Sequence, residues 1–449
     1  MASKFDLSSK FVRPTFLIKI VAVIVHINFT LILPLFYTWQ NAFSIGPKEL
    51  GLLPATIALS EAFVNVMFGK LATHYSIPHI AAFGLMLLSI GTFATSLSTH
   101  YFQLLLSCML QGFGLALIMP ALINITIDLA AKERVGREIS QLNISCELGL
   151  FVGIMCGTIF SLGTLYSIEK WRIFVFSLAC VQLLTSFYVL RYLRGLPATK
   201  SSKKMGWDGF VDLFSLSTIK SIVKSPTLTL LFGAEASLFL AIGGSVFLIL
   251  LGQMIGFSVV QMFVLYIFSF ASVVIGLTVG GRISDHLAAK KPFYGRLDFS
   301  LCSIILCTIM FYILLVEVAP DKKSYPIFLG ILLLFGIVSR FLNNSAMVSE
   351  IVDPAQKTHV FALFRLIQLV MLNISPALCG WLSESIFGFQ IIGNVTSEER
   401  ALLTESNIYA LRASLKTLAL LGGSGCVLIY LWLRFTKRSP FSQNNNVKS

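Results

Sequence analysis

Long apolar runs separated by short polar connections dominate the chain. Each run is close to the roughly 20 residues that a helix needs to cross a bilayer. Lipid offers no hydrogen-bond partners to the backbone, so spans of this kind must be helical. The pattern therefore predicts an all-α polytopic membrane protein with twelve transmembrane helices. The predicted spans cover residues 16–38, 50–70, 79–98, 102–128, 141–164, 172–192, 228–251, 258–281, 299–318, 325–349, 359–383 and 409–433.

Composition and charge agree with a membrane protein and fix an expected orientation. Of the 449 residues, 56% are hydrophobic and only 12% are charged, against about 25% charged in soluble domains. The net charge of +13 comes largely from connections on one predicted side, such as 193–227 and 282–298. This positive-inside bias predicts that both termini are cytoplasmic, in a plasma or bacterial inner membrane, and it argues against a nucleic-acid partner. The first apolar run is too long for a cleaved signal peptide, so we expect an uncleaved span.

The sequence carries no signature of an enzyme. All eight cysteines fall inside predicted spans, where neither a disulfide framework nor a zinc site is expected. No nucleophile–base pair, phosphate-binding loop or metal-ligand spacing is present. We therefore predict a protein without catalytic residues, metal or cofactor.

An internal repeat divides the chain into halves. The segment 281–291 has a counterpart at 69–76, and the glycines that open them, Gly69 and Gly281, are 212 positions apart; the same offset carries the first apolar run onto 228–250. Repeated halves are typical of transporters. We predict a six-helix bundle over 1–193, a basic cytoplasmic linker over 194–227, a second bundle over 228–438 and a tail over 439–449.

The segment 281–291 also points to a family. Gly281, Asp285, Lys290 and Lys291 resemble the cytoplasmic loop signature G-x-x-x-D-[RK]-x-G-[RK]-[RK] of the major facilitator superfamily. The resemblance implies two pseudo-symmetric six-helix bundles around a central cavity. It also implies a conformational latch in which Asp285 faces the positive end of a helix of the other half, or Arg137. Gly69 and Gly281 open the two latch loops.

Small residues predict close helix packing in the fifth span of each half. Gly149, Gly153 and Gly157 lie on one helical face, as in small-xxx-small interfaces. They resemble the antiporter signature G-x-x-x-G-P-x-x-G-G of the same family. The counterpart in the second half is the segment 375–380, which contains Pro376.

Charged and polar residues inside the spans are the candidates for function, because such side chains are costly in lipid. Glu61 and Arg340 are foremost, since both lie near the middle of a predicted span. The alternative is structural: a packing histidine, a neutral glutamate between helices, or an arginine that ties helices together. The predicted substrate and proton pathway comprises His26, Glu61, Asn65, Gln111, Glu147, Glu235, Arg340, Asn344 and Arg365.

These features predict a secondary active transporter that moves a small organic solute by alternating access. Resemblance to drug and metabolite antiporters favours proton-coupled efflux. The two intramembrane arginines favour an alternative, a proton symporter or facilitator that imports an organic anion. A receptor or scaffold that does not transport is a third hypothesis, which the retained intramembrane charges disfavour. The expected partners are the solute, protons and the bilayer, and we expect a monomer.

Overall fold

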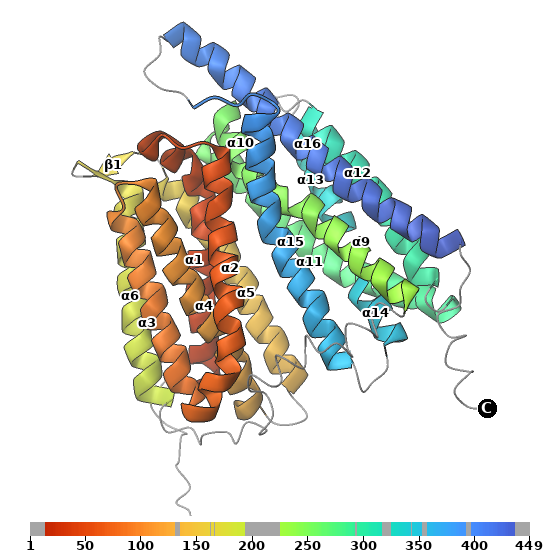
Figure 1. Ribbon diagram of the computed structural model, residues 1–449, viewed down its shortest axis with the longest axis horizontal. Helices are drawn as coiled ribbons and strands as arrows, with labels where there is room; N and C mark the ends of the chain where they lie inside the picture. The colour runs from red at the N-terminus through yellow and green to blue at the C-terminus, as the bar shows by residue number, and fades with distance from the viewer. Residues whose placement is uncertain are drawn as a thin grey trace, which may run out of the picture.

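Two helical bundles, one from each half of the chain, make up the molecule (Figure 1). The computed structural model describes residues 14–130, 135–161, 163–165, 167–193, 225–291, 294–316, 325–342, 344–352, 357–391 and 397–435. Nearly all of the predicted linker and the whole predicted tail lie outside these ranges. The first bundle comprises α1 (Pro14–Phe43), α2 (Pro47–His74), α3 (Ile77–Leu97), α4 (Tyr101–Leu129), α5 (Val135–Phe160) and α6 (Lys170–Leu193).

The second bundle contains helices that are interrupted as well as continuous ones. Its elements are α9 (Pro226–Gly243), the 3-10 turn η2 (Gly244–Val246), α10 (Phe247–Ile255), α11 (Val259–Lys290), α12 (Tyr294–Val316), α13 (Tyr325–Ser339), α14 (Asn344–Ile351), α15 (Lys357–Ser385) and α16 (Ser397–Phe435). The sequence predicts each of the spans 228–251 and 325–349 as one helix, but the first bends through η2 and the second is broken after Ser339. Unwound backbone inside a membrane must lie in protein or line a wet cavity, so both breaks direct attention to the space between the bundles.

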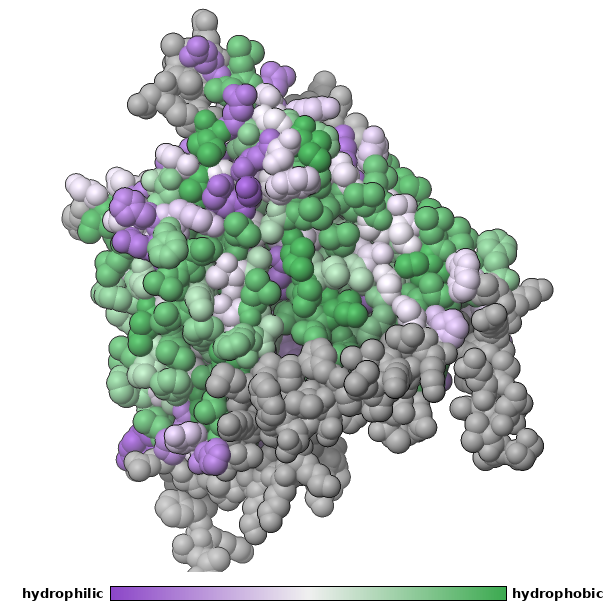
Figure 2. Space-filling model, in the orientation of Figure 1, coloured by the Kyte–Doolittle hydropathy of each residue, from purple (hydrophilic) through white to green (hydrophobic). Residues whose placement is uncertain are grey.

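The predicted all-α membrane fold is confirmed. Within the described ranges, eleven helices or broken helix pairs are long and apolar enough to cross a membrane. The helix α2 adds a twelfth rod of 28 residues, packed between α4 of its own bundle and α15 of the other. On the face that Figure 2 shows, apolar side chains cover the middle of both bundles, and most hydrophilic residues lie above or below them.

The glycine stripe of α5 lies against α1. A Cβ atom at Gly149 would meet the carbonyl of Val23, one at Gly153 would meet Thr30, and one at Gly157 would meet the carbonyl of Leu31. The absence of side chains therefore lets the two backbones approach closely along three turns, as helix packing in lipid requires.

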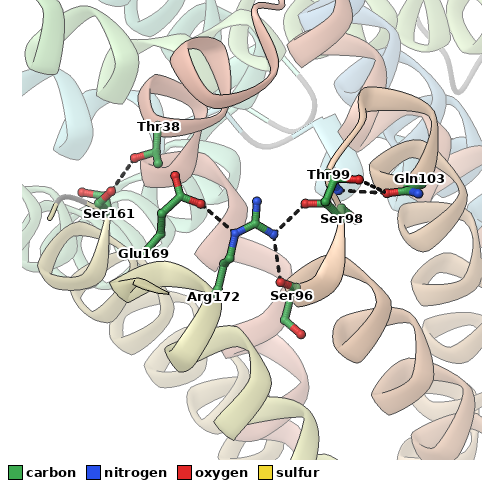
Figure 3. Close-up of polar contacts among 8 residues, drawn as sticks. All are labelled: Thr38, Ser96, Ser98, Thr99, Gln103, Ser161, Glu169 and Arg172. Carbon is green, nitrogen blue, oxygen red and sulfur yellow. Dashed lines mark hydrogen bonds and ion pairs between the residues drawn. The ribbon is translucent and has the colours of Figure 1, made fainter. Parts of the chain in front are cut away.

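A short antiparallel hairpin, β1 (Thr164–Leu165) and β2 (Ile168–Glu169), precedes α6 and was not predicted. Arg172 connects it to the α3–α4 connection, because its guanidinium donates to Glu169 at 2.7 Å and to the carbonyls of Ser96 and Ser98 at 3.0 and 2.6 Å (Figure 3). The same guanidinium lies over the ring of Trp171. This end of the first bundle is thus closed by charge-assisted hydrogen bonds.

The two bundles touch at the end that carries this hairpin, which we call the hairpin end. There α2 and α15 cross so closely that a Cβ at Gly51 would meet the carbonyl of Pro376, and one at Gly380 would meet the carbonyl of Pro47. The backbone N–H of Lys48 also donates to Glu384 across the crossing, at 2.8 Å.

Two further helix pairs close the hairpin end. Phe36 of α1 packs on Phe247 of α10, and Phe151 of α5 packs on Phe270 of α11. Toward the opposite end, where α1 begins and α6 ends, the bundles diverge (Figure 1). We call this the terminal end. The molecule is therefore closed at its hairpin end and spread at its terminal end.

Candidate functional site

A buried carboxylate, Glu235 of α9, lies at the centre of the polar groups in the second bundle. Only 3% of Glu235 is exposed. Its two oxygens accept hydrogen bonds from Asn344, at 2.6 Å, and from Gln368. Asn344 is the first residue of α14, directly after the break in that span, so the break brings its amide to the carboxylate. A charge at this depth is tolerated only with such partners.

The hydrogen bonds continue from Glu235 in two directions. The guanidinium of Arg365 donates to the side-chain oxygen of Gln368 at 2.8 Å, one turn away on α15. The hydroxyl of Tyr430, on α16, donates to the side-chain oxygen of Asn344. The set joins four helices of one bundle, and we call it the carboxylate network: Glu235, Asn344, Arg365, Gln368 and Tyr430.

Arg365 carries this network to the bundle interface. It reaches Glu235 through Gln368 and forms no ion pair with a carboxylate of the described residues. Glu61 of α2 is hydrogen-bonded to Asn65. The crossing of α2 and α15 explains the placement, because the antiparallel register that sets Gly51 on Pro376 puts Glu61 level with the Arg365 region. Glu61 is half-buried and Arg365 is exposed. A cation linked to Glu235 and a carboxylate of the other half therefore lie at the same level of the α2–α15 crossing.

Arg340 lies at the break between α13 and α14, whereas the sequence predicts it inside one continuous helix over 325–349. It lies in the unwound segment after α13 and is exposed. Its Cβ packs near Gly276 of α11, and no carboxylate of the described residues lies within salt-bridge distance of it. Arg365, and not Arg340, is joined to Glu235, through the side chain of Gln368.

His26 and Glu147 form a second group of predicted residues, in the first bundle. The Nδ1 atom of His26 lies 2.8 Å from the carbonyl of Ala22, and the imidazole interacts electrostatically with Glu147 of α5. Glu147 is exposed and lies one turn before Phe151, the residue that meets α11. The carboxylate thus lies on the side of α5 that faces the second bundle, toward the spread end.

Gln111 lies inside the first bundle instead of at the interface between the halves. It is 2% exposed. Its Oε1 accepts from Asn28 at 2.9 Å, and its Nε2 donates to Thr95 at 2.8 Å. The Oδ1 atom of Asn28 also accepts from Thr92 and Gln182, at 2.7 and 3.1 Å. These neutral groups join α1, α3, α4 and α6, and we call them the amide network. A role of Gln111 in the pathway stays a prediction.

The predicted latch residues are apart in this conformation. Asp285 accepts from Arg296 of its own bundle at 2.8 Å, and Arg296 also donates to Glu350 at 2.7 Å. Arg137 is exposed at the start of α5. Gly281 has open space around it, and the surroundings of Gly69 lie outside the described part of the chain. A latch between the halves stays a prediction for a state in which the terminal ends meet.

Some functional candidates were missed by sequence reasoning. Gln368 could have been found, because it lies three residues after Arg365 and hence on the same helical face. Tyr430 gave no signal, since the sequence predicts its helix to lie in the outer ring. Asn28 and Gln182 are polar residues in spans like many others, so nothing in the sequence singles them out.

Comparison with known proteins agrees with this architecture. The family model of the Major Facilitator Superfamily matches residues 19–344. The quinolone resistance protein NorA of Staphylococcus aureus is 22% identical over 130 residues, which are 29% of this chain and 34% of NorA. Multidrug resistance protein 2 of Bacillus subtilis is 22% identical over 161 residues, or 36% of this chain and 40% of that protein. The matches thus span only about a third of these curated relatives.

Solved structures share the fold along nearly the whole chain. A bacterial homologue of the human lysosomal transporter Spinster, in an inward-facing and unoccupied conformation, superposes with a TM-score of 0.79 at 16% identity and covers 96% of this chain and 100% of its own. The nucleoside transporter NupG superposes with a TM-score of 0.67 at 13% identity, with 94% and 100% covered. At these identities the likeness establishes the fold.

Proposed function

Because this chain belongs to the Major Facilitator Superfamily, we propose that it is a secondary transporter that exports a small organic solute in exchange for protons. The observation that carries the proposal is the placement of Arg365, which is joined to Glu235 through Gln368 and lies level with Glu61 of the other bundle at the α2–α15 crossing. A charge network that reaches the interface responds both to what binds there and to how the bundles are arranged.

The proposed coupling follows from the charges. An arginine remains protonated in proteins, so Arg365 is a permanent cation, whereas Glu61 and Glu235 can each take up a proton. Protonation of Glu61 removes its attraction for Arg365 and weakens the tie between α2 and α15. A solute that binds beside the carboxylates competes with that proton. Coupling results when the proton and the solute favour different arrangements of the bundles.

The spread terminal end supports alternating access around this site. Glu61 and Arg365 lie beyond the closed crossing of α2 and α15, on the side where the bundles diverge. With the terminal end in the cytoplasm, as the basic connections predict, this conformation would receive solute from inside. Export then requires that the Gly51–Pro376 crossing open and the terminal ends meet.

The test is flux in proteoliposomes with an imposed pH gradient. A quinolone is the first solute to try, because the matched relative NorA is named for quinolone resistance. An acidic lumen should drive its accumulation. We expect Glu61→Gln to lower this flux at least about tenfold, while Glu405→Gln, at an exposed glutamate of α16, leaves it unchanged. Flux of wild-type size in Glu61→Gln would overturn the site, and flux indifferent to pH would overturn proton coupling.

A second candidate is import of an organic anion, which the placement of Arg340 favours. Its guanidinium is exposed at a helix break and has no salt-bridge partner among the described residues. An anionic solute could supply the missing charge. In the same vesicles, accumulation of benzoate driven by external acid, and lost in Arg340→Gln, would favour import over export.

A further inference from the structure

A cavity at the terminal end of the second bundle lies away from the interface between the halves. It has a volume of about 440 Å³ and is formed by the end of α11 and the first two turns of α12. Its lining is Leu287, Lys290, Lys291, Gly295, Asp298, Phe299 and Cys302. The volume is within the usual range for small-molecule sites. Leu287, Phe299 and Cys302 give it apolar walls, and Lys290, Lys291 and Asp298 add charge.

The helix α12 shows that this cavity faces lipid. Within the described part of the chain, α12 packs on α11, α13 and α16, all of its own bundle. Its remaining face is apolar and exposed, along a stripe at helical spacing that begins at the cavity: Cys302, Leu306, Ile309 and Ile313. A chain that enters the cavity from the membrane would thus find a continuous apolar path along α12.

The charge of the cavity favours an anion. Asp298 is neutralised by Arg434 of α16, which lies 2.7 Å away. Lys290 and Lys291 are exposed, and neither has a salt-bridge partner among the described residues. The two lysines end the polar extension of α11 that follows the apolar run, and the cavity places them beside Phe299 and Cys302, where the apolar part of α12 begins. Two unpaired cations at this level, above an apolar surface, match a phosphate above acyl chains.

We infer that this cavity binds an anionic phospholipid, with its phosphate at Lys290 and Lys291 and an acyl chain along the α12 stripe. The lipid would hold α11 against α12, and it would be an accessory ligand rather than the transported solute. None of the cavity residues belongs to the carboxylate network, although Lys290 and Lys291 end the predicted latch segment 281–291.

Binding of soluble short-chain lipids to the purified full-length protein tests the inference. Dioctanoyl phosphatidylglycerol should raise the melting temperature, whereas dioctanoyl phosphatidylcholine, glycerol 3-phosphate and inorganic phosphate should raise it little. A lysine near an anionic lipid surface contributes about fivefold in affinity, so the double variant Lys290→Gln/Lys291→Gln should bind about 30-fold more weakly. Arg191→Gln, at an exposed arginine in the last turn of α6, is the control and should bind as the wild type does.

Protection of Cys302 from alkylation is a second test, and it keeps Lys290 and Lys291 in place. Cys302 and Cys180 are both exposed, but only Cys302 lines the cavity. Phosphatidylglycerol should slow alkylation of Cys302 by a maleimide in detergent several-fold and leave Cys180 unaffected. Equal protection of the two cysteines, equal binding by the double variant, or equal effects of phosphatidylcholine or free phosphate would each overturn the inference.

Discussion

The two bundles each contain a buried polar network, but the networks differ in charge and in reach. The amide network around Asn28 is made of neutral side chains and ends within the first bundle. The carboxylate network around Glu235 contains a carboxylate and a guanidinium, and Arg365 extends it to the α2–α15 crossing, level with Glu61 of the other bundle. A neutral network holds helices together in one arrangement. A charged network changes its interactions when a proton or solute arrives, so we assign stability to the first and coupling to the second.

The largest expected difference between the two networks is in solute flux, when the central side chain of each is replaced by alanine. Glu235→Ala removes the acceptor of both Asn344 and Gln368 and leaves Arg365 bonded to Gln368 without a carboxylate beyond it. We expect flux per folded molecule to fall at least about 100-fold, because more than one kind of contact is lost. Asn28→Ala, the matched change in the amide network, should leave flux per folded molecule within about twofold. The measurement is solute flux in proteoliposomes, normalised to monodisperse protein.

Comparing flux in Glu235→Ala and Asn28→Ala tests the assignment in two ways. Equal losses of flux per folded molecule in Glu235→Ala and Asn28→Ala would contradict the assignment of coupling to the carboxylate network alone. A large loss in Asn28→Ala alone would reverse the assignment and place the pathway beside Gln111, where the sequence predicts it.

The second prediction concerns the free energy of unfolding, for which a change in the amide network should cost more than a change in the carboxylate network. Asn28→Leu removes three hydrogen bonds, to Gln111, Thr92 and Gln182, and leaves those groups buried. Interhelical hydrogen bonds in membranes average about 0.6 kcal/mol, so we expect a loss of about 2 kcal/mol. Glu235→Gln keeps an amide oxygen as acceptor and should lose less. Thermal unfolding in detergent measures both, and a lower melting temperature for Glu235→Gln than for Asn28→Leu would contradict the comparison.

The sequence predicts the positions of the helices better than the breaks within them. Hydropathy finds each membrane-spanning run, as for 16–38 inside α1 (Pro14–Phe43), because burial in lipid demands a long apolar run whatever the neighbours. It does not find the polar extensions of the helices: α11 continues nine residues past the predicted end at 281, and α16 begins twelve residues before the predicted start at 409. It misses the interruptions near Gly244 and after Ser339. The apolar character continues through both, and unwinding depends on the helices that pack there.

The sequence could not predict which arginine lies near Glu235, because that also depends on how the helices pack. Charged residues inside spans can be recognised one at a time by their cost in lipid, which identifies Glu61, Glu235 and Arg365 as candidates. Whether Arg340 or Arg365 meets Glu235 depends on the crossing of α15 with α2 and α9. Glycines at that crossing, Gly51 and Gly380, set the distance, and their contacts lie hundreds of positions apart in the chain.

The smallest expected effect is at the far end of the carboxylate network, on α16. The Tyr430 hydroxyl donates one hydrogen bond to Asn344, and the ring is fully buried. Tyr430→Phe keeps the packing and removes that bond, so we expect a loss of about 0.6 kcal/mol in stability. Asn344 also donates to Glu235, so a freer amide should loosen its hold on the carboxylate and shift the pH at which flux is half-maximal.

Tyr312→Phe is the control for this last change, because Tyr312 is an exposed tyrosine of α12 outside both networks. It should alter neither melting temperature nor the pH profile. A Tyr430→Phe variant that loses stability with an unchanged pH profile would mean that the network's influence on transport ends at Asn344. In that case α16 only supports the bundle, and the coupling residues are confined to α2, α9, α14 and α15.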